Sequence, residues 1–575
     1  MRRTQLALLW CLPLAILLAG CGLPLAQGVQ RPTRTVSVGS PQPGDIRVLP
    51  PGPRRDSTPE AVVEGFLAAQ SSPDSSHAIA REFLAPGTAW DDRAGLLIYD
   101  PTTLDPSTAP GDDSTVVVTA MITGEVRADG SYDATSRQLR ETYSLRTGPS
   151  GLQLVGVPPG LRLAIADRDR SFLARNVFFL APAYGLTSDT PNLVADRLFL
   201  PVSDDLAQRL IEHLLRGPSS ALAGAVETAV PKGTRLLAPV TTQDGTVTVS
   251  LSAEAQALAQ PQRAQLSAQL VWTLRQLDAD FQHLRLLSGG QLLTITGRVG
   301  SGLSDLQSRT DWADYDPDGM APGAPLYYVA DGGLRSLTTV GGGATRSSAA
   351  TDGSLAIESA AVSTSGNQLG LISTRGQLLS GPLGGPFTVR LTAPGMSSPT
   401  WGSGEQGLWL LREGAPVRIP DAGPASTVPV EGDNTGPFDS MRLSRDGARV
   451  ALVADKRLWL GRIEVDRNGP RLMGVHEVVP GLQDVGAVAW ETSTTLVVLA
   501  RFGTQLLLPV RVAIDGSTVV SAGRAGISGV PGEIAAAPGR PLVLGVTDGQ
   551  RRRLLSDDEL FFQPGPAGTA PVYPG

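Results

Sequence analysis

The two cysteines of this 575-residue chain, Cys11 and Cys21, lie near its start, and no cysteine follows them. Thiols can form a disulfide, act as nucleophiles or bind a metal as thiolates. Their surroundings favour a different use, because the basic pair Arg2 and Arg3 precedes an apolar run over residues 6–20. That layout is typical of a secretory signal, whereas a membrane-spanning helix needs about 20 apolar residues. A buried core helix is the alternative interpretation, and it gives the two arginines no role.

The apolar run ends in Leu18-Ala19-Gly20-Cys21, which resembles the lipobox of bacterial lipoproteins. The resemblance implies that the Cys21 thiol receives a diacylglycerol, that a peptidase then cuts between Gly20 and Cys21, and that the new amine takes a further acyl chain such as palmitate. Several acyl chains satisfy the requirement for stable anchoring to a bilayer. We therefore expect a mature protein held through Cys21 on the outer face of the cell membrane.

The rest of the sequence contains no complete motif that predicts a catalytic or metal-binding site. Loss of Cys11 with the leader leaves the folded body without a free thiol, which excludes a disulfide or a thiolate site. No Gly-x-Ser-x-Gly elbow and no phosphate-cradling glycine loop occurs, and no two carboxylates are paired as glycoside hydrolysis requires. The histidines have no spacing that would converge on a metal: they are His77, His213, His283 and His476. We expect no catalytic residue, no metal, no cofactor and no enzymatic activity.

One acidic fragment fits the opening of a calcium-binding loop. Residues 314–319 alternate aspartates with other residues and end in a glycine, as such loops begin. The twelfth position, which should supply a bidentate glutamate, is Pro325. We therefore expect a turn that leads into the following domain.

The net charge of the chain restricts which kinds of partner it can attract. The formal net charge is −7 at pH 7 and becomes −9 once the two leader arginines are removed. A negatively charged body attracts neither nucleic acid nor an anionic bilayer surface. Of the chain's partners, only membrane lipid at Cys21 follows from the residues themselves.

The first folded part follows a proline-rich tether over residues 21–57. A small α+β domain is predicted over residues 58–165. It opens with a helix that Thr58 caps and Pro59 begins, continues with a second helix and ends in several strands joined by turns. Helices followed by antiparallel strands suggest a cone like that of nuclear transport factor or cystatin.

The second domain, over residues 170–300, alternates strands with two helices that each carry a leucine stripe. Four fragments resemble the GerMN domain of spore-germination and cell-envelope proteins: LLRGPS, AVPKGTRLL, GTVTVSLS and QLVWTLRQL. That resemblance implies an α/β domain.

The last part, residues 316–575, repeats short strands with almost no helical periodicity. Similar turn sequences recur at Ser363, Trp401, Ser444, Trp490 and Ala537, at intervals of 38, 43, 46 and 47 residues. Repeats of about 40 to 50 residues that contain only strands are typical of a β-propeller, with one blade per repeat. We expect five to seven blades. The fold class is thus multidomain: α+β, then an α/β GerMN-like domain, then an all-β propeller.

This order of lipobox, tether, α+β domain, GerMN-like domain and propeller resembles the LpqB lipoproteins of high-GC Gram-positive bacteria. The resemblance implies an accessory role beside the MtrA/MtrB two-component system, in which the lipoprotein contacts the extracytoplasmic part of the sensor kinase MtrB and affects cell-envelope homeostasis. Cys21 is the one family position that transfers residue by residue. The alternative is a lipoprotein that binds, or modifies, peptidoglycan or another glycan of the cell wall.

Overall fold

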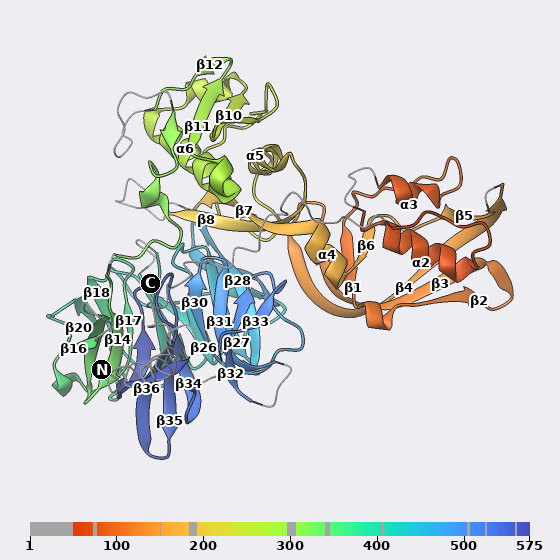
Figure 1. Ribbon diagram of the computed structural model, residues 1–575. Helices are drawn as coiled ribbons and strands as arrows, with labels where there is room; N and C mark the ends of the chain where they lie inside the picture. Colours follow the sequence, from red (N-terminus) through yellow and green to blue (C-terminus); the bar gives the residue numbers. More distant parts are fainter. Residues whose placement is uncertain are drawn as a thin grey trace, which may run out of the picture. The chain divides into compact units, whose positions relative to one another are not determined.

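The computed structural model describes most of the chain from residue 50 onward (Figure 1). The described ranges are 50–72, 77–149, 151–182, 192–295, 306–321, 323–339, 345–403, 407–502, 506–523, 526–557 and 561–575. Three regions follow one another: helices on a sheet, a second α/β region, and a long series of hairpins.

The first region packs helices on one face of a sheet that is antiparallel except for one parallel pair of strands. Its elements are α2 (Pro59–Ala69), α3 (Ala78–Glu82), β1 (Leu96–Tyr99), β2 (Asp105–Ala109), β3 (Asp112–Val126), β4 (Tyr132–Gly148), β5 (Gly151–Gly156), β6 (Leu161–Ala164) and α4 (Ile165–Ser171). The sheet order is β5-β4-β3-β1-β6, with β2 paired to β3 and with β1 parallel to β6. Thr58 caps α2 as predicted: its hydroxyl accepts from the Ala61 backbone N–H at 3.3 Å.

Helix α2 is held on this sheet by an aromatic cluster. Phe66 is 1% exposed and meets the rings of Trp90 and Tyr143 edge to face, at centroid distances of 5.1 and 6.3 Å. Such pairs add about 0.5–1.5 kcal/mol to the burial of their area. Below them, Arg162 and Glu141 form an ion pair in which both side chains are largely buried.

A long two-stranded ribbon connects this region to the next. Its strands are β7 (Phe172–Leu180) and β8 (Leu193–Pro201), which pair antiparallel along their whole length. At one end Phe199 packs in the core of the first region, whereas Leu193 and Leu198 pack in the core of the second. Residues 193–196 are all buried, so both faces of β8 are covered there.

The second region places two helices against a small sheet. Its elements are α5 (Leu206–Arg216), β9 (Thr241–Gln243), β10 (Thr246–Leu251), α6 (Gln260–Leu274), β11 (His283–Ser288), β12 (Gln291–Leu292) and β13 (Gln307–Ser308). Strands β10 and β11 are parallel, and α6 forms the crossover between them. The leucine stripes of α5 and α6 face a common core with β7, β8 and β10.

The third region forms six sheets of four or five strands within the described residues. They are β14 (Leu326–Ala330), β15 (Gly333–Thr339) and β16 (Thr345–Ala349) with β38 (Thr569–Val572); β17 (Ile357–Val362), β18 (Gln368–Ser373), β19 (Gln377–Pro382) and β20 (Thr388–Thr392); β21 (Met396–Trp401), β22 (Leu408–Arg412), β23 (Ala415–Ile419) and β24 (Ser426–Thr427); β26 (Ser440–Leu443), β27 (Arg449–Ala454), β28 (Arg457–Asp466) and β29 (Gly469–Glu477) with β25 (Val430–Gly432); β30 (Gln483–Thr492), β31 (Thr495–Arg501), β32 (Leu508–Ala513) and β33 (Val519–Ser521); and β34 (Val530–Ala535), β35 (Val543–Asp548), β36 (Arg551–Asp557) and β37 (Phe562–Ala567).

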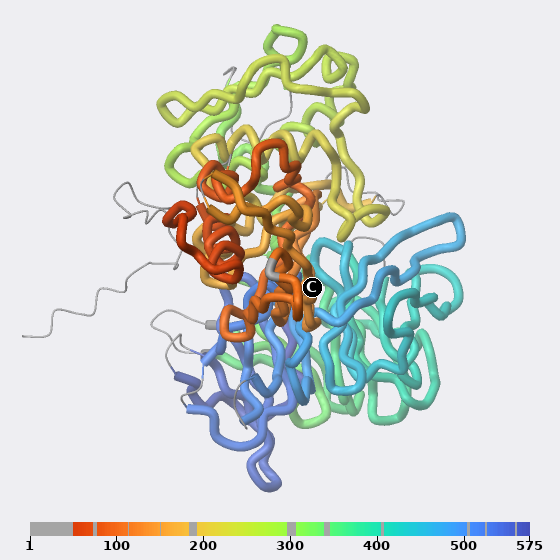
Figure 2. The backbone as a smooth tube through the Cα atoms, turned by 90° about the vertical axis from the view of Figure 1, so that its right-hand side faces the viewer, coloured from red at the N-terminus to blue at the C-terminus, as the bar shows by residue number. Residues whose placement is uncertain are grey.

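These sheets are the blades of a propeller. The first strands of five blades and the last strand of the chain contact one another in turn, and β38 also contacts β17, so the six close a ring: β17, β21, β26, β30, β34 and β38. Because β38 pairs with β14, the end of the chain completes the first blade. Figure 2 shows the blades as successive hairpins that run from green to blue. The repeated sequences noted above lie where the ring strands end.

Candidate binding site in the propeller channel

The predicted lipidation site, Cys21, and the predicted cut after Gly20 lie outside the described residues, as does Cys11. In the described part of the chain, no helix is both long and apolar enough to cross a bilayer. Because both cysteines lie outside the described residues, a functional site in the described part of the chain must use other residue types.

The four histidines lie on separate elements. His77 precedes α3, His213 lies in α5, His283 begins β11 and His476 lies in β29. Burial, with a contribution from the neighbouring Arg216, lowers the pKa of His213 to about 4, so its ring is neutral at pH 7. Across the described ranges, no three His, Cys, Asp or Glu side chains gather as metal ligands would.

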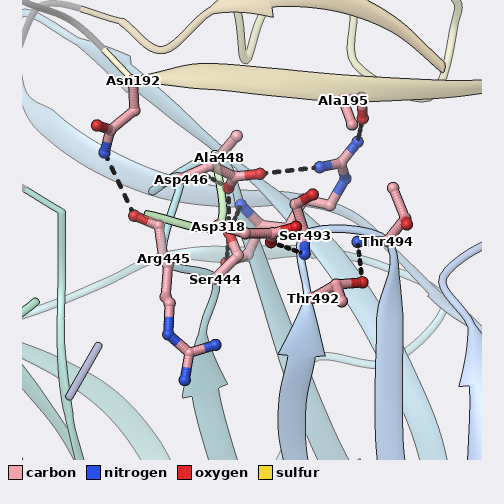
Figure 3. Close-up of polar contacts among 11 residues, drawn as sticks. Asn192, Ala195, Asp318, Ser444, Arg445, Asp446, Ala448, Thr492, Ser493 and Thr494 are labelled. Carbon is pink, nitrogen blue, oxygen red and sulfur yellow. Dashed lines mark hydrogen bonds and ion pairs between the residues drawn. The ribbon is translucent and has the colours of Figure 1, made fainter. Parts of the chain in front are cut away.

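The acidic fragment forms a turn that leads into β14. The Asp316 carboxylate accepts from the Asp318 backbone N–H at 2.9 Å, and the Gly319 N–H donates to the Asp316 carbonyl at 3.0 Å. The Asp318 carboxylate instead accepts from the backbone N–H of Ser493, in the turn between β30 and β31 (Figure 3). Burial raises the pKa of Asp318 to about 6. This carboxylate thus fastens the turn to a propeller blade.

Strand β8 is tied to the propeller by a buried arginine (Figure 3). Arg449 donates to the carbonyl of Ala195 in β8 and pairs with Asp446 at 3.3 Å. Asp446 is 0% exposed and also accepts from the Ser444 hydroxyl. Asn192, just before β8, donates from its side-chain amide to the backbone carbonyl of Arg445 at 3.4 Å.

The two charged residues that follow Ala195 have partners in different regions. The Asp196 carboxylate accepts from the backbone N–H and the hydroxyl of Ser219, both at 2.7 Å, and burial raises its pKa. Arg197 pairs with Asp515, in the turn after β32, at 2.9 Å. Arg168 of α4 reaches the same turn, where it donates to the Ser517 carbonyl at 3.4 Å. We call the contacts of β8 with residues 444–449 and 515–517 the ribbon joint.

Beside the ribbon joint, the ring of strands surrounds a central channel. Arg445 lies in it, and its guanidinium donates to the carbonyls of Pro574, Trp490 and Ala536 at 3.1, 3.0 and 3.1 Å. These three carbonyls come from different parts of the ring. Burial lowers the pKa of Arg445 to about 10, which leaves it charged at pH 7.

A second arginine, Arg442, lines a small cavity in this channel. The cavity has a volume of about 30 Å³, and we call it the channel cavity. Arg445 and Thr400 also line it, together with apolar and aromatic residues such as Trp490 and Tyr573. The Arg442 guanidinium donates to the Met441 carbonyl at 2.9 Å, while the Arg442 carbonyl accepts from the Trp490 indole at 3.0 Å. Burial lowers the pKa of Arg442 to about 10, against the opposing influence of Glu533.

Neither arginine is predicted from the sequence, although the turn at Ser444 is one of the five repeated turns. A signal was present in the comparison of blades. Counted two residues before each repeat marker, the positions equivalent to Arg442 are Ala361, Pro399, Val488 and Ala535, all uncharged. An arginine in the ring strand of one blade therefore marks a position where something other than blade packing is required.

Models of three protein families match the chain. Residues 52–168 match the lipoprotein LpqB N-terminal domain, residues 176–294 match a domain of sporulation and spore germination, and residues 335–574 match the lipoprotein LpqB beta-propeller domain. The predicted fold classes of the three regions are confirmed in their predicted order.

Whole proteins are also similar to the chain. A lipoprotein LpqB of Thermobifida fusca is 29% identical, over 98% of this chain and 97% of the relative. One of Streptomyces coelicolor is 28% identical, over 97% and 96%. One of Mycolicibacterium smegmatis is 28% identical, over 84% and 85%. The similarity thus extends beyond the separate domains to nearly the whole chain.

Proposed function

Because this chain belongs to the LpqB lipoprotein family, we propose that it is a lipid-anchored accessory partner of the MtrA/MtrB two-component system. It contacts the extracytoplasmic part of the sensor kinase MtrB and acts by binding, without catalysis. The lipid on Cys21 holds it on the outer face of the membrane, and its effect on the kinase reaches cell-envelope homeostasis. Support comes from the family membership, the lipobox and the domain order.

The family membership carries this proposal, and the ribbon joint suggests how the three regions could act together in it. Arg168 of the first region and Arg197 of the ribbon both reach the turn at residues 515–517, and Arg449 binds β8 from the propeller. Charged side chains buried between regions are costly to separate once paired. The three regions are therefore held together, so a partner that binds one region also encounters the surfaces of the other two.

Anchoring supplies the rest of the mechanism. A protein held to a bilayer meets an embedded partner at a raised effective concentration, as linked binding modules do. Binding then shifts the kinase between conformations only to the extent that the lipoprotein prefers one of them.

The channel cavity favours partner binding over glycan hydrolysis at that place. A volume of about 30 Å³ holds about two water molecules and not a sugar ring. The two charged side chains that reach it, Arg442 and Arg445, are cations, whereas glycoside hydrolysis uses two carboxylates.

The test is retention of the detergent-solubilised, full-length lipoprotein on two matrices. One carries the extracytoplasmic domain of MtrB, and the other is purified cell wall. We expect retention on the kinase domain, which Arg449→Met weakens through the ribbon joint and the exposed Arg375→Gln does not. Retention on the wall with none on the kinase domain would overturn the proposal in favour of the wall-binding alternative.

A further inference from the structure

The channel cavity contains a positive charge whose donors are mostly uncommitted. A guanidinium has five N–H donors and stays protonated in proteins. Among the described residues, the one acceptor on the Arg442 guanidinium is the carbonyl of its neighbour Met441. Arg445, by contrast, donates from all three of its nitrogens to carbonyls of the ring. Arg442 is therefore the group in the channel that has donors to offer.

The protein's own carboxylates compensate this charge poorly. Glu533, in a different blade, interacts electrostatically with Arg442. Its carboxylate also accepts a hydrogen bond from the Ala570 backbone N–H at 2.8 Å and interacts electrostatically with Arg552. Asp318 acts on Arg445 and is fastened to Ser493. The residues that line the cavity include these two arginines and no aspartate or glutamate. Arg442 is half-buried, so water reaches part of its guanidinium, and an anion that displaces this water would pair with a cation that the protein itself compensates little.

The size of the cavity restricts what that anion can be. A single water needs roughly 10–15 Å³ of such volume, so about 30 Å³ admits one ion or group of a few heavy atoms. A saccharide or a folded loop is too large. The lining combines apolar side chains with the two arginines, so an anion that enters lies close to positive charge.

We propose that the channel cavity binds one compact anion, the size of chloride or of a single carboxylate group, on the guanidinium of Arg442. A planar guanidinium suits a carboxylate particularly well, because the two can share parallel hydrogen bonds. The same chemistry is available from a free ion and from the carboxylate of a peptide segment that enters the channel. The site is independent of the proposed partnership with the kinase.

Bromide is the direct probe, since it replaces chloride and is located by anomalous scattering. Crystals of the full-length lipoprotein soaked in sodium bromide should show a peak in the channel in contact with the Arg442 guanidinium. A channel that contains only water, with bromide peaks confined to the outer surface, would overturn the proposal. This measurement needs no variant and is unaffected by any folding defect.

Thermal unfolding gives the matched comparison. At constant ionic strength, bromide or acetate in place of gluconate should raise the Tm of the wild type by about 2–4 °C once the anion exceeds its Kd several-fold. Arg442→Gln should lose this shift, and Arg375→Gln, at an exposed turn, should keep it. Loss in both variants, or in neither, would refute the assignment to Arg442.

Two peptides distinguish a free anion from a peptide carboxylate as the occupant of the channel cavity. Trialanine with a free carboxylate and trialanine amide are each added to wild type in gluconate. If trialanine alone reproduces the shift, the site accepts a peptide carboxylate. If neither peptide does while bromide and acetate do, the site is reserved for free anions. Equal shifts from both peptides would contradict recognition of a carboxylate.

Discussion

Replacing Arg449 by methionine removes the cation at the centre of the ribbon joint. Arg449 is 5% exposed and Asp446 0% exposed, so neither charge is solvated. Removing one partner of a buried ion pair costs about 3–5 kcal/mol, chiefly because the other charge is left alone. Asp446 would keep the Ser444 hydroxyl and the Ala448 N–H, the latter at 3.0 Å. We therefore expect the lower end of that range, about 3 kcal/mol.

Amide hydrogen exchange on the full-length lipoprotein measures this loss locally. Strand β8 loses its contact at Ala195, so its amides should exchange about 100-fold faster, since each 1.4 kcal/mol or so is a factor of about ten. The backbone amides that hydrogen-bond β3 to β4 lie in the first region, far along the chain from Arg449. They should keep their wild-type exchange rates. Arg457→Met is the matched control, because Arg457 pairs with Glu477 at 3.0 Å but its side chain is 56% exposed. An exposed pair contributes about 1 kcal/mol or less.

Two results would refute the reasoning. One is exchange in β8 that stays within about threefold of the wild type. The other is an equal acceleration in Arg457→Met, which would show that any lost ion pair has the same effect. Adding Asp446→Asn to Arg449→Met should restore part of the protection, because it removes the uncompensated carboxylate that the single variant leaves behind.

The remaining predictions concern the anchor, the acidic turn and the core of the first region. Cys21→Ala should accumulate as an unprocessed precursor without lipid label, and normal labelling would contradict the lipobox. Burial raises the pKa of Asp318 from 3.8 to about 6, so the folded form binds that proton more tightly than the unfolded chain, and the contribution of Asp318 to stability falls as pH rises between these values. Asp318→Asn should flatten that part of the Tm-against-pH curve relative to the wild type, and an unaltered slope would show that another group titrates. Phe66→Ala should lower the free energy of unfolding by about 3–5 kcal/mol in denaturant titration, because it empties the contact with Trp90 and Tyr143, and a loss below about 1 kcal/mol would mean that the ring is not part of a packed core.

Local patterns explain why much of the fold could be predicted. Five of the blades described end their ring strand in a similar turn, so the markers from Ser363 to Ala537 recur at the length of one blade. Ser363 and Ser444 show the reason: each hydroxyl accepts at 3.0 Å from the backbone N–H five residues on, which closes the turn to the next strand. The start of α2 was predictable for a similar reason, since Thr58 and Pro59 act within one helical turn.

The ribbon joint and the channel cavity depend on pairs that no local pattern records. Arg449 binds a carbonyl 254 residues earlier in the chain, and Arg197 pairs with a carboxylate 318 residues later. Nothing in either neighbourhood specifies the partner, because the pairing exists only after three regions have folded. The blade number was equally open to sequence analysis, since β38 completes the first blade from the far end of the chain.

Strand β8 nevertheless carried a readable signal. Its sequence, Leu193–Pro201, is apolar enough for a strand buried on both faces, yet it places Asp196 and Arg197 side by side in the middle. Two adjacent opposite charges on a strand point to opposite faces, so they cannot neutralise each other directly. Burying both therefore requires a separate partner on each side, and the structure supplies them as Ser219 and Asp515. Adjacent unlike charges in an apolar strand thus indicate a ribbon held between two other parts of the protein.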